Sequence, residues 1–299
     1  MTKSEKSLLS KKELLELFIN HRVHSPLPGD WESIFKGLGY EFWALREREP
    51  TDSFKNIDWK AKAKTGKYFV REFLAESYFN VMILYDISRS VHFGRKELLQ
   101  AHIAVSLAYS AMLSNDGCGL ILFAEDIMEY IPPRMGRAHF MEILYAIVHA
   151  EPVACGATNL SAALTKLIHE VPESLAFILS DFMYPLDFTN SINHTGHGTD
   201  KHEIKAIQVL EECEFELPPQ STGVLPLYDY ESGTCVELDL GKWKAYNETM
   251  SQLHAATRKR LNRAGIDLVT ISPADDFAQK INTFMKRPPS RSSAQVRMP

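Results

Sequence analysis

Asp86, Ser88 and Ser90 bring one carboxylate and two hydroxyls together at alternate positions, directly after the apolar run 81–85. A run of this length is too short to cross a membrane and is typical of a strand buried on both faces of a parallel sheet. In open α/β sheets, ligands bind beyond the carboxyl ends of the strands. We therefore expect this D-x-S-x-S cluster to lie at a ligand-binding edge.

Two further polar positions are expected at the same edge. Thr158 directly precedes a predicted helix, and Asp181 follows the apolar run 175–179. Carboxylate and hydroxyl oxygens are hard ligands that suit Mg²⁺ or Mn²⁺. The pattern predicts a metal site in which two carboxylates hold the ion directly or through water. An acidic side chain of a partner would take the remaining coordination position of the ion. Its ligands would be Asp86, Ser88, Ser90, Thr158 and Asp181.

A structural interpretation of the same residues stays open. Asp86 and Ser88 could simply cap the helix that follows them, and Asp181 could accept backbone N–H groups in a turn. A lone D-x-S-x-S is a weak motif, because serine and aspartate are common in loops. Its position after a buried strand, together with Thr158 and a second strand that ends in Ser-Asp, favours the metal site.

The elements that position these residues alternate along the chain. Apolar runs predict strands at 81–85, 118–123, 175–179, 204–210 and 266–271, and helical periodicity predicts helices at 96–113, 137–149, 159–171, 244–264 and 275–286. Residues 127–131 could return as an edge strand beside 118–123. This alternation predicts an α/β fold with a doubly wound, mostly parallel sheet and helices on both faces.

Other segments fall outside this alternation. We divide the chain into an N-terminal helix and linker (1–36), an N-terminal β segment (37–75), the α/β domain (76–286) with a β-hairpin insertion at about 214–240, and a disordered tail (287–299). The segments 40–46 and 68–73 and the hairpin 225–238 lack partners in the parallel sheet. We expect them to pair with one another as a small β-rich subdomain.

Composition narrows the function class. The 299 residues are 45% hydrophobic and 24% charged, with a net charge of -5, so no basic field favours nucleic acid as a partner. No apolar run approaches the roughly 20 residues that span a bilayer. The four cysteines form no C-x-x-C pair, which is typical of free thiols in a reducing compartment. A cytoplasmic protein is therefore expected.

Some residues are weaker functional candidates. His92 follows the D-x-S-x-S cluster and could face the metal or a partner, and Asp58 and Trp59 could form a partner contact. Packing or solvent exposure explains His92 better than a functional role, and packing against the core is the alternative for Trp59. His194, His197 and His202 could suggest a zinc site, although no cysteine accompanies them. The chain has neither a phosphate-binding G-x-x-x-x-G-K-[ST] loop nor a G-x-S-x-G nucleophile motif.

The metal-site pattern resembles the metal-ion-dependent adhesion site of the von Willebrand factor A (vWA) fold, in which D-x-S-x-S, a threonine and a later aspartate hold Mg²⁺. Residues 37–42, 45–47, 56–60 and 180–182 further resemble the bacterial family called domain of unknown function 58. The chain departs from many members at Lys55, where they have arginine, and at Val91, where they have methionine. Neither departure removes a metal ligand.

This resemblance implies a function. Members of the family accompany MoxR-type AAA+ ATPases, so it implies a non-enzymatic, Mg²⁺-dependent protein-binding module that acts as an adaptor in maturation or assembly of client proteins. The alternative is a metal-dependent phosphohydrolase with Asp86 as nucleophile, since a strand-end aspartate beside Mg²⁺ can serve that role. Such enzymes use a second carboxylate two residues later, where this chain has Ser88.

Overall fold

The computed structural model describes residues 45–47, 69–71, 80–153, 158–184, 186, 202–218, 223–228 and 234–286. Contacts divide the chain into two units, of which one is Asp30–Phe79 and the other holds the remaining residues. The predicted N-terminal helix, the C-terminal tail and the candidates Asp58 and Trp59 lie outside the described residues. None of the helices described is long and apolar enough to cross a membrane.

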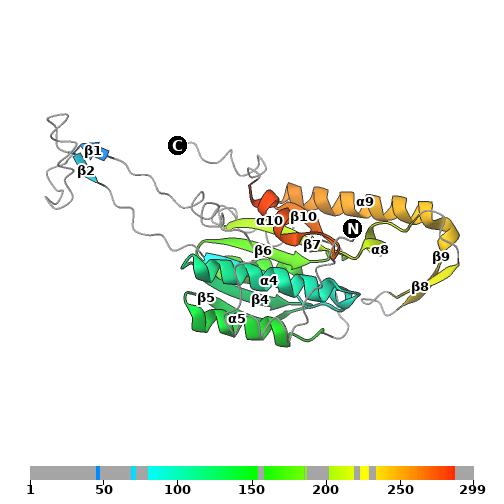
Figure 1. Ribbon diagram of the computed structural model, residues 1–299, viewed down its shortest axis with the longest axis horizontal. Helices are drawn as coiled ribbons and strands as arrows, with labels where there is room; N and C mark the ends of the chain where they lie inside the picture. Colours follow the sequence, from blue (N-terminus) through cyan, green and yellow to red (C-terminus); the bar gives the residue numbers. More distant parts are fainter. Residues whose placement is uncertain are drawn as a thin grey trace, which may run out of the picture. The chain divides into compact units, whose positions relative to one another are not determined.

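A six-stranded sheet forms the centre of the larger unit (Figure 1). Its order is β10-β7-β6-β3-β4-β5, and every neighbouring pair is parallel except β4 and β5. The strands are β3 (Asn80–Asp86), β4 (Gly117–Phe123), β5 (Ile127–Arg134), β6 (Ser174–Ser180), β7 (His202–Val209) and β10 (Asp267–Ile271). The predicted mostly parallel sheet is confirmed, as is the edge strand that begins at Ile127.

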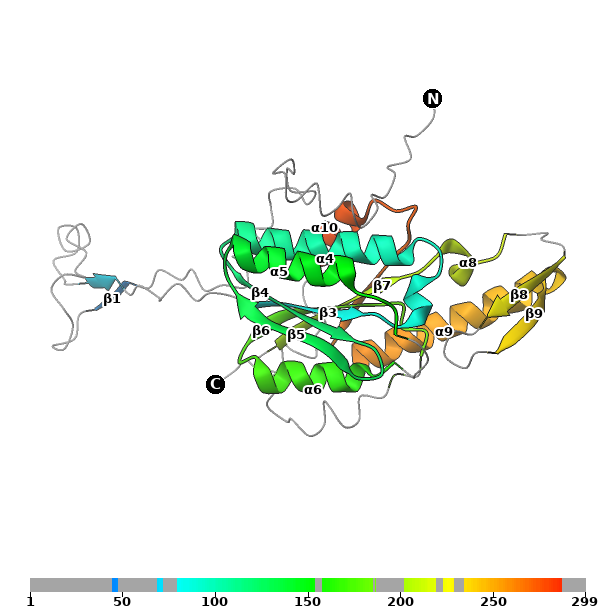
Figure 2. The same ribbon diagram turned by 90° about the horizontal axis from the view of Figure 1, so that it is seen from below.

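Helices cover both faces of this sheet (Figure 2). One face carries α4 (Lys96–Leu113), α5 (Arg137–His149) and α10 (Phe277–Met285), and the other carries α6 (Leu160–Glu170) and α9 (Trp243–Arg263). In the part of the chain that the structure describes, three short helices were not predicted: η2 (Arg89–His92), α8 (Glu212–Phe215) and η4 (Leu240–Lys242). The predicted doubly wound α/β architecture is therefore confirmed.

The central strands are apolar along their whole length because both of their faces are covered. All seven residues of β4 and of β6 are buried. In β3, Met82 and Leu84 pack with residues of α6 and α9 such as Leu164 and Leu261. The continuous apolar runs in the sequence thus indicate strands that are buried on both faces, whereas a half-exposed strand would alternate apolar and polar residues.

The strand order reverses between β3 and β6. From β3 the chain winds to β4 and β5 on one side, and from β6 it winds to β7 and β10 on the other. Ligands of doubly wound sheets bind at such a switch point, outside the carboxyl ends of the strands. Asp86 ends β3, and Asp181 directly follows β6. The topology therefore brings the two predicted carboxylates to the switch point.

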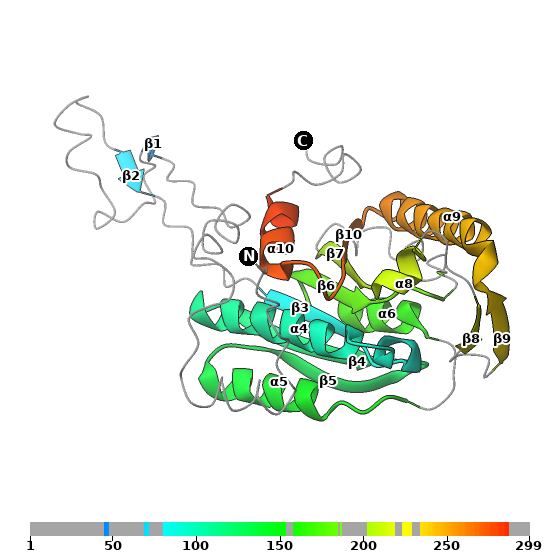
Figure 3. The same ribbon diagram turned by 45° about the vertical axis from the view of Figure 1, so that its right-hand side comes forward.

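Two small antiparallel sheets complete the structure. β1 (Leu45–Glu47) pairs with β2 (Phe69–Arg71), and β8 (Val224–Tyr228) pairs with β9 (Cys235–Asp239). The predicted pairing of 40–46 with 68–73 is confirmed, and so is the predicted hairpin. The prediction that all of these segments pair with one another is wrong, because each pair is a separate two-stranded sheet. The strands of the hairpin are joined by a short connection, so pairing with each other costs little loop entropy. The hairpin lies at the start of α9, on the side where the parallel strands end (Figure 3).

Candidate metal-binding site

Asp86 is fully buried at the end of β3, and both of its carboxylate oxygens are held. Oδ1 accepts a hydrogen bond of 2.8 Å from the backbone N–H of Ser88. Oδ2 accepts one of 2.5 Å from the hydroxyl of Ser180, which is the last residue of β6. These bonds fix the carboxylate across the switch point. The sequence pattern did not indicate a role for Ser180 beyond preceding Asp181.

The two predicted serine ligands lie side by side. Ser88 precedes η2 and Ser90 lies within it, and their hydroxyls form a hydrogen bond of 3.1 Å. Neighbouring ligands of an octahedral Mg²⁺, at about 2.1 Å from the ion, are separated by about 3.0 Å. Ser88 is the N-cap residue of η2, but its side chain makes no capping hydrogen bond. Its hydroxyl therefore fits a ligand better than a cap.

Asp181 is also fully buried and lies in a sharp turn. Its Oδ1 accepts a hydrogen bond of 3.2 Å from the backbone N–H of Met183, as the turn interpretation expected. The next residue, Phe182, has φ of 52°, a left-handed conformation that bulky residues rarely adopt. Strained backbone of this kind clusters at functional sites. The turn explains one oxygen of Asp181 and leaves the other for a cation.

The electrostatics of the site favour a cation close to Asp86 and Asp181. Burial, and next the nearby charge of Asp181, raise the pKa of Asp86 from its ordinary value of 3.8 to about 7. Hydrogen bonds from Ser180 and Ser88 oppose this shift without cancelling it. Two buried carboxylates that repel each other are stabilised by a positive ion between or beside them. The donor set, hard oxygens throughout, suits Mg²⁺ or Mn²⁺.

A buried lysine that sequence reasoning missed already supplies one positive charge. Lys96, the first residue of α4, is fully buried, and its Nζ lies 3.0 Å from Asp181 Oδ2 and 2.7 Å from Glu214 Oε1. Burial opposes its charge, but the two carboxylates outweigh burial and raise the pKa of Lys96. In the sequence, a lysine at the start of a helix is typical of an exposed position. Its partners lie 85 and 118 residues away, so no local pattern indicates them.

Two glutamines hold the strand ends that carry the site. The Gln100 amide donates to the backbone oxygens of Asp86 at 2.8 Å and Leu179 at 3.3 Å, and so joins β3 to β6. The Gln208 amide donates to the oxygen of Asp181 at 2.9 Å. Both side chains are buried, so these bonds are protected from competition with water. They keep the switch point in one geometry.

Thr158 lies at the same end of the sheet as Asp86, near the end of the neighbouring strand β4. It is buried and directly precedes α6, whose N-cap Asn159 accepts a hydrogen bond of 3.1 Å from the backbone N–H of Ala162. The backbone N–H of Asn159 donates to the oxygen of Ala124, immediately after β4, at 2.7 Å. Because β4 neighbours β3, this bond places Thr158 on the side where Asp86 lies.

The histidine candidates have nearby partners. His92 Nδ1 lies 2.6 Å from Glu97 Oε2 at the rim of the site. His202 is buried in β7, where its Nδ1 lies 2.9 Å from the Ser174 hydroxyl, so it belongs to the sheet and not to a loop tract. His194 and His197 lie outside the described residues. Among the residues described, no group of three or more histidine, cysteine, aspartate or glutamate side chains could hold a metal.

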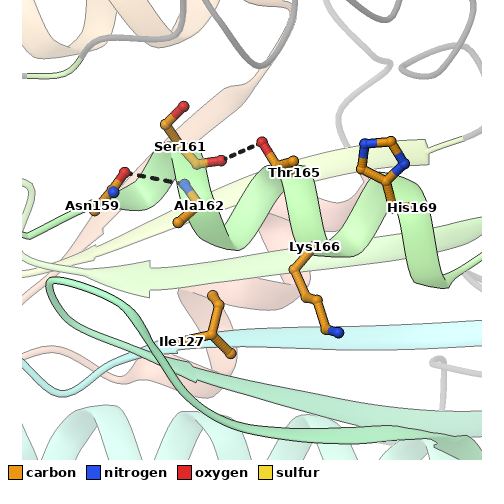
Figure 4. A pocket seen from close by; sticks show the side chains of 7 residues that line it. All are labelled: Ile127, Asn159, Ser161, Ala162, Thr165, Lys166 and His169. Carbon is orange, nitrogen blue, oxygen red and sulfur yellow. Dashed lines mark hydrogen bonds between the residues drawn. The ribbon is translucent and has the colours of Figure 1, made fainter.

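A pocket of about 450 Å³ lies along α6 (Figure 4). It is lined by Ile127, Asn159, Ser161, Ala162, Thr165, Lys166 and His169. Its polar groups are used locally: Thr165 donates to the backbone oxygen of Ser161 at 2.8 Å, and Lys166 pairs with Glu170 at 2.8 Å. None of the predicted metal ligands lines this pocket, so we treat it as separate from the metal site.

Comparisons with solved structures find partial likenesses. They include BatB from Bacteroides thetaiotaomicron, with a TM-score of 0.44, 16% identity and coverage of 70% of this chain and 100% of that one. A von Willebrand factor type A protein from Catenulispora acidiphila gives a TM-score of 0.42 at 12% identity, covering 71% of this chain and 43% of that one. At these scores the likenesses carry no argument, and the fold assignment depends on the sheet order.

Comparisons at the sequence level are more extensive. The chain is 27% identical over 281 residues to Uncharacterized protein Rv1480 of Mycobacterium tuberculosis, and the aligned region covers 91% of this chain and 86% of that protein. It is 26% identical over 163 residues to Uncharacterized protein MAV169 of Mycobacterium avium, which covers 53% of this chain and 94% of that protein. A family model matches residues 44–260, and the chain therefore belongs to the family described as Protein of unknown function DUF58.

Proposed function

We propose that this protein is a non-enzymatic, Mg²⁺-dependent protein-binding module. Ser88, Ser90 and Thr158 would hold the ion, with Asp86 and Asp181 supporting it directly or through water. The observation that carries the proposal is the pair of serine hydroxyls, hydrogen-bonded at 3.1 Å, beside the buried carboxylate of Asp86. When bound, the ion would supply an electrophilic position for an oxygen ligand from another molecule.

The missing ligand would be a Glu or Asp side chain of a partner protein. The hydroxyls add no charge, and Lys96 offsets part of the charge of Asp181, so a bound ion would keep attraction for an anion. The hairpin of β8 and β9 extends from the end of the sheet at which the parallel strands finish (Figure 3) and could offer further contacts.

The family resemblance supplies the partner class. We infer that a MoxR-like AAA+ ATPase, or a client of such an ATPase, binds this chain in the cytoplasm during maturation or assembly of other proteins. The chain itself carries no P-loop sequence, so ATP hydrolysis would belong to the partner. This division of labour is that of an adaptor.

Metal-dependent recovery of the partner tests the proposal. A candidate MoxR-like ATPase is captured on the immobilised full chain with Mg²⁺, with a chelator, and with the Asp86→Ala variant. We expect recovery only with Mg²⁺ and the unaltered chain. Glu173→Gln is a matched control, because Glu173 is exposed before β6, at the opposite end of the sheet. Equal recovery under all conditions would defeat the proposal.

The alternative function, phosphoryl transfer through Asp86, has less support from the geometry. A nucleophilic carboxylate needs an oxygen that can reach the substrate, whereas both oxygens of Asp86 accept hydrogen bonds and the residue is fully buried. The position two residues later holds the Ser88 hydroxyl where a second carboxylate would be needed. We therefore assign Asp86 to organising the metal.

A further inference from the structure

We propose that Lys96 is a resident cation that competes with the divalent ion for Asp181, and that Glu214 weakens this competition by binding the other side of the ammonium. The inference rests on the proposed function, since it concerns the same metal site. It assigns roles to two residues that are not metal ligands. Both act on metal affinity through Asp181.

The geometry that supports the proposal is a shared ammonium group. Lys96 Nζ lies between a carboxylate at the end of β6 and a carboxylate on α8, 3.0 Å from Asp181 and 2.7 Å from Glu214. The lysine side chain has no exposed surface, and the Phe93 ring centre is 5.7 Å away. Water therefore does not screen the charge, and each carboxylate feels it strongly.

Lys96 and a divalent ion would favour the same oxygen. Asp181 Oδ2 accepts the ammonium, while Oδ1 is used by the backbone N–H of Met183. An ion near Asp181 is repelled by the ammonium, and the carboxylate that attracts the ion is already partly neutralised. Lys96 thus lowers the affinity for metal. It also keeps Asp181 paired when no metal is present, which a buried carboxylate requires.

Glu214 gives the ammonium a second anion. Its position is fixed within α8, where its Oε2 accepts a hydrogen bond of 2.9 Å from the backbone N–H of Glu211. The backbone oxygen of Glu214 lies 3.1 Å from His254 Nε2 on α9, and Glu211 accepts a bond from the backbone N–H of Arg95. A firmly held Glu214 lets Lys96 stay paired while Asp181 turns toward a metal ion.

This arrangement links the metal site to the inserted segment. α8 begins the connection that leads from β7 through the hairpin to α9 (Figure 3). Metal binding at Asp181 strengthens the pairing of Lys96 with Glu214, and by reciprocity a well-docked α8 strengthens metal binding. We therefore expect the docking of α8, the first element of the inserted segment, to change when the metal site is filled.

Metal titration of four full-length proteins tests the inference. Mn²⁺ binding is measured by calorimetry on the unaltered chain, Lys96→Met, Glu214→Gln and the double variant. We expect Lys96→Met to bind Mn²⁺ about tenfold more tightly and Glu214→Gln about tenfold more weakly, within the usual range of coupling between sites. In the Lys96→Met background, Glu214→Gln should have little further effect, because no ammonium remains for it to hold.

Another buried lysine gives a matched control. Lys205 on β7 is buried and its Nζ lies 2.9 Å from Glu203, so Lys205→Met and Glu203→Gln remove the same groups elsewhere in the sheet. These two variants should leave Mn²⁺ affinity unchanged.

The outcomes separate this inference from the proposed function. If the unaltered chain and Glu214→Gln bound Mn²⁺ with equal affinity, this inference would be overturned and the proposed function would stand. A loss from Glu214→Gln that persists in the Lys96→Met background would overturn it too, because it would reflect direct attraction of the ion by Glu214. If no form bound metal, both proposals would fall. Should Lys96→Met fail to fold, an unchanged Mn²⁺ affinity in Glu214→Gln would still overturn the inference, since this variant retains the pair of Lys96 with Asp181.

Discussion

The hydroxyl of Ser180 donates a 2.5 Å hydrogen bond to Asp86 Oδ2 and so ties the end of β6 to the end of β3. Ser180 Oγ also accepts a hydrogen bond of 3.0 Å from the backbone N–H of Phe182, the residue with the left-handed backbone. One buried hydroxyl therefore holds both the carboxylate of the first strand and the turn that follows Asp181. This link makes the site a single rigid unit.

Removal of this hydroxyl should destabilise the fold. In Ser180→Ala, a buried carboxylate oxygen and a buried N–H each lose a partner, and we expect a loss of about 1–3 kcal/mol in the free energy of unfolding. Urea unfolding measures it. Ser110→Ala is the control, because the buried Ser110 hydroxyl has no hydrogen-bond partner in the described part of the chain, and its loss should change stability by less than about 0.5 kcal/mol. Equal losses would contradict the role of Ser180.

Loss of the Ser88 hydroxyl should weaken metal binding more than it destabilises the metal-free fold. Asp86 Oδ1 is held mainly by the backbone N–H of Ser88, which alanine retains. We expect Ser88→Ala to weaken Mg²⁺ binding at least about tenfold, the effect of losing an interaction of about 1.4 kcal/mol. Calorimetry with Mg²⁺ and thermal unfolding without it measure the two effects. An unchanged Mg²⁺ affinity would show that Ser88 is not a ligand.

The raised pKa of Asp86 predicts a pH dependence with a defined sign. In the metal-free folded state the pKa of Asp86 is about 7, compared with 3.8 ordinarily, so between these values the folded state binds more protons than the unfolded state. Asp86 should therefore reduce the free energy of unfolding as the pH rises from about 4 to 7, by up to about 1.4 kcal/mol per pH unit. Asp86→Asn removes this slope. Unfolding between pH 5 and 8 in chelator measures it, and equal slopes in both proteins would contradict the assignment.

The same group predicts how metal binding depends on pH. Because Mg²⁺ binds the ionised carboxylate, its affinity should rise up to about pH 7 and level off above, with a proton released on binding below that pH. Calorimetry in buffers of different ionisation heat counts this proton. Binding that releases no proton at pH 6 would place Asp86 outside the site.

The non-enzymatic assignment predicts that phosphatase substrates are not turned over. A screen of phosphate esters with Mg²⁺ and with Mn²⁺ should give the rate of the buffer alone, because both Asp86 oxygens are already hydrogen-bonded. Turnover that disappears in Asp86→Asn and persists in Glu173→Gln would instead establish the phosphohydrolase alternative.

The main sheet could be predicted because its signals are local. The apolar runs of β3, β4 and β6 indicate strands that helices cover on both faces of the sheet. The helical periodicity of the sequence predicted the bounds of α4 and α5 correctly at both ends. The hairpin of β8 and β9 was predicted, but alternation could not show that it forms a sheet separate from β1 and β2, because alternation indicates strands and not all of their partners.

The candidate site could be predicted only where its residues form a sequence pattern. Asp86, Ser88, Ser90 and Asp181 follow apolar runs, and parallel strands bring such ends together. Lys96 and Glu214 were missed because their roles depend on pairing across 118 residues. Gln100 was missed because a glutamine inside a helix is typical of an exposed face, whereas this one is fully buried at the switch point.

Calorimetric titration of the metal-free full chain with Mg²⁺, compared with Asp86→Ala, tests the central claim most directly. We expect saturable binding of one ion by the unaltered chain, with no saturable heat from the variant although it remains folded. Indistinguishable titrations of the two proteins, or an absence of binding by the unaltered chain, would contradict a metal site built around Asp86.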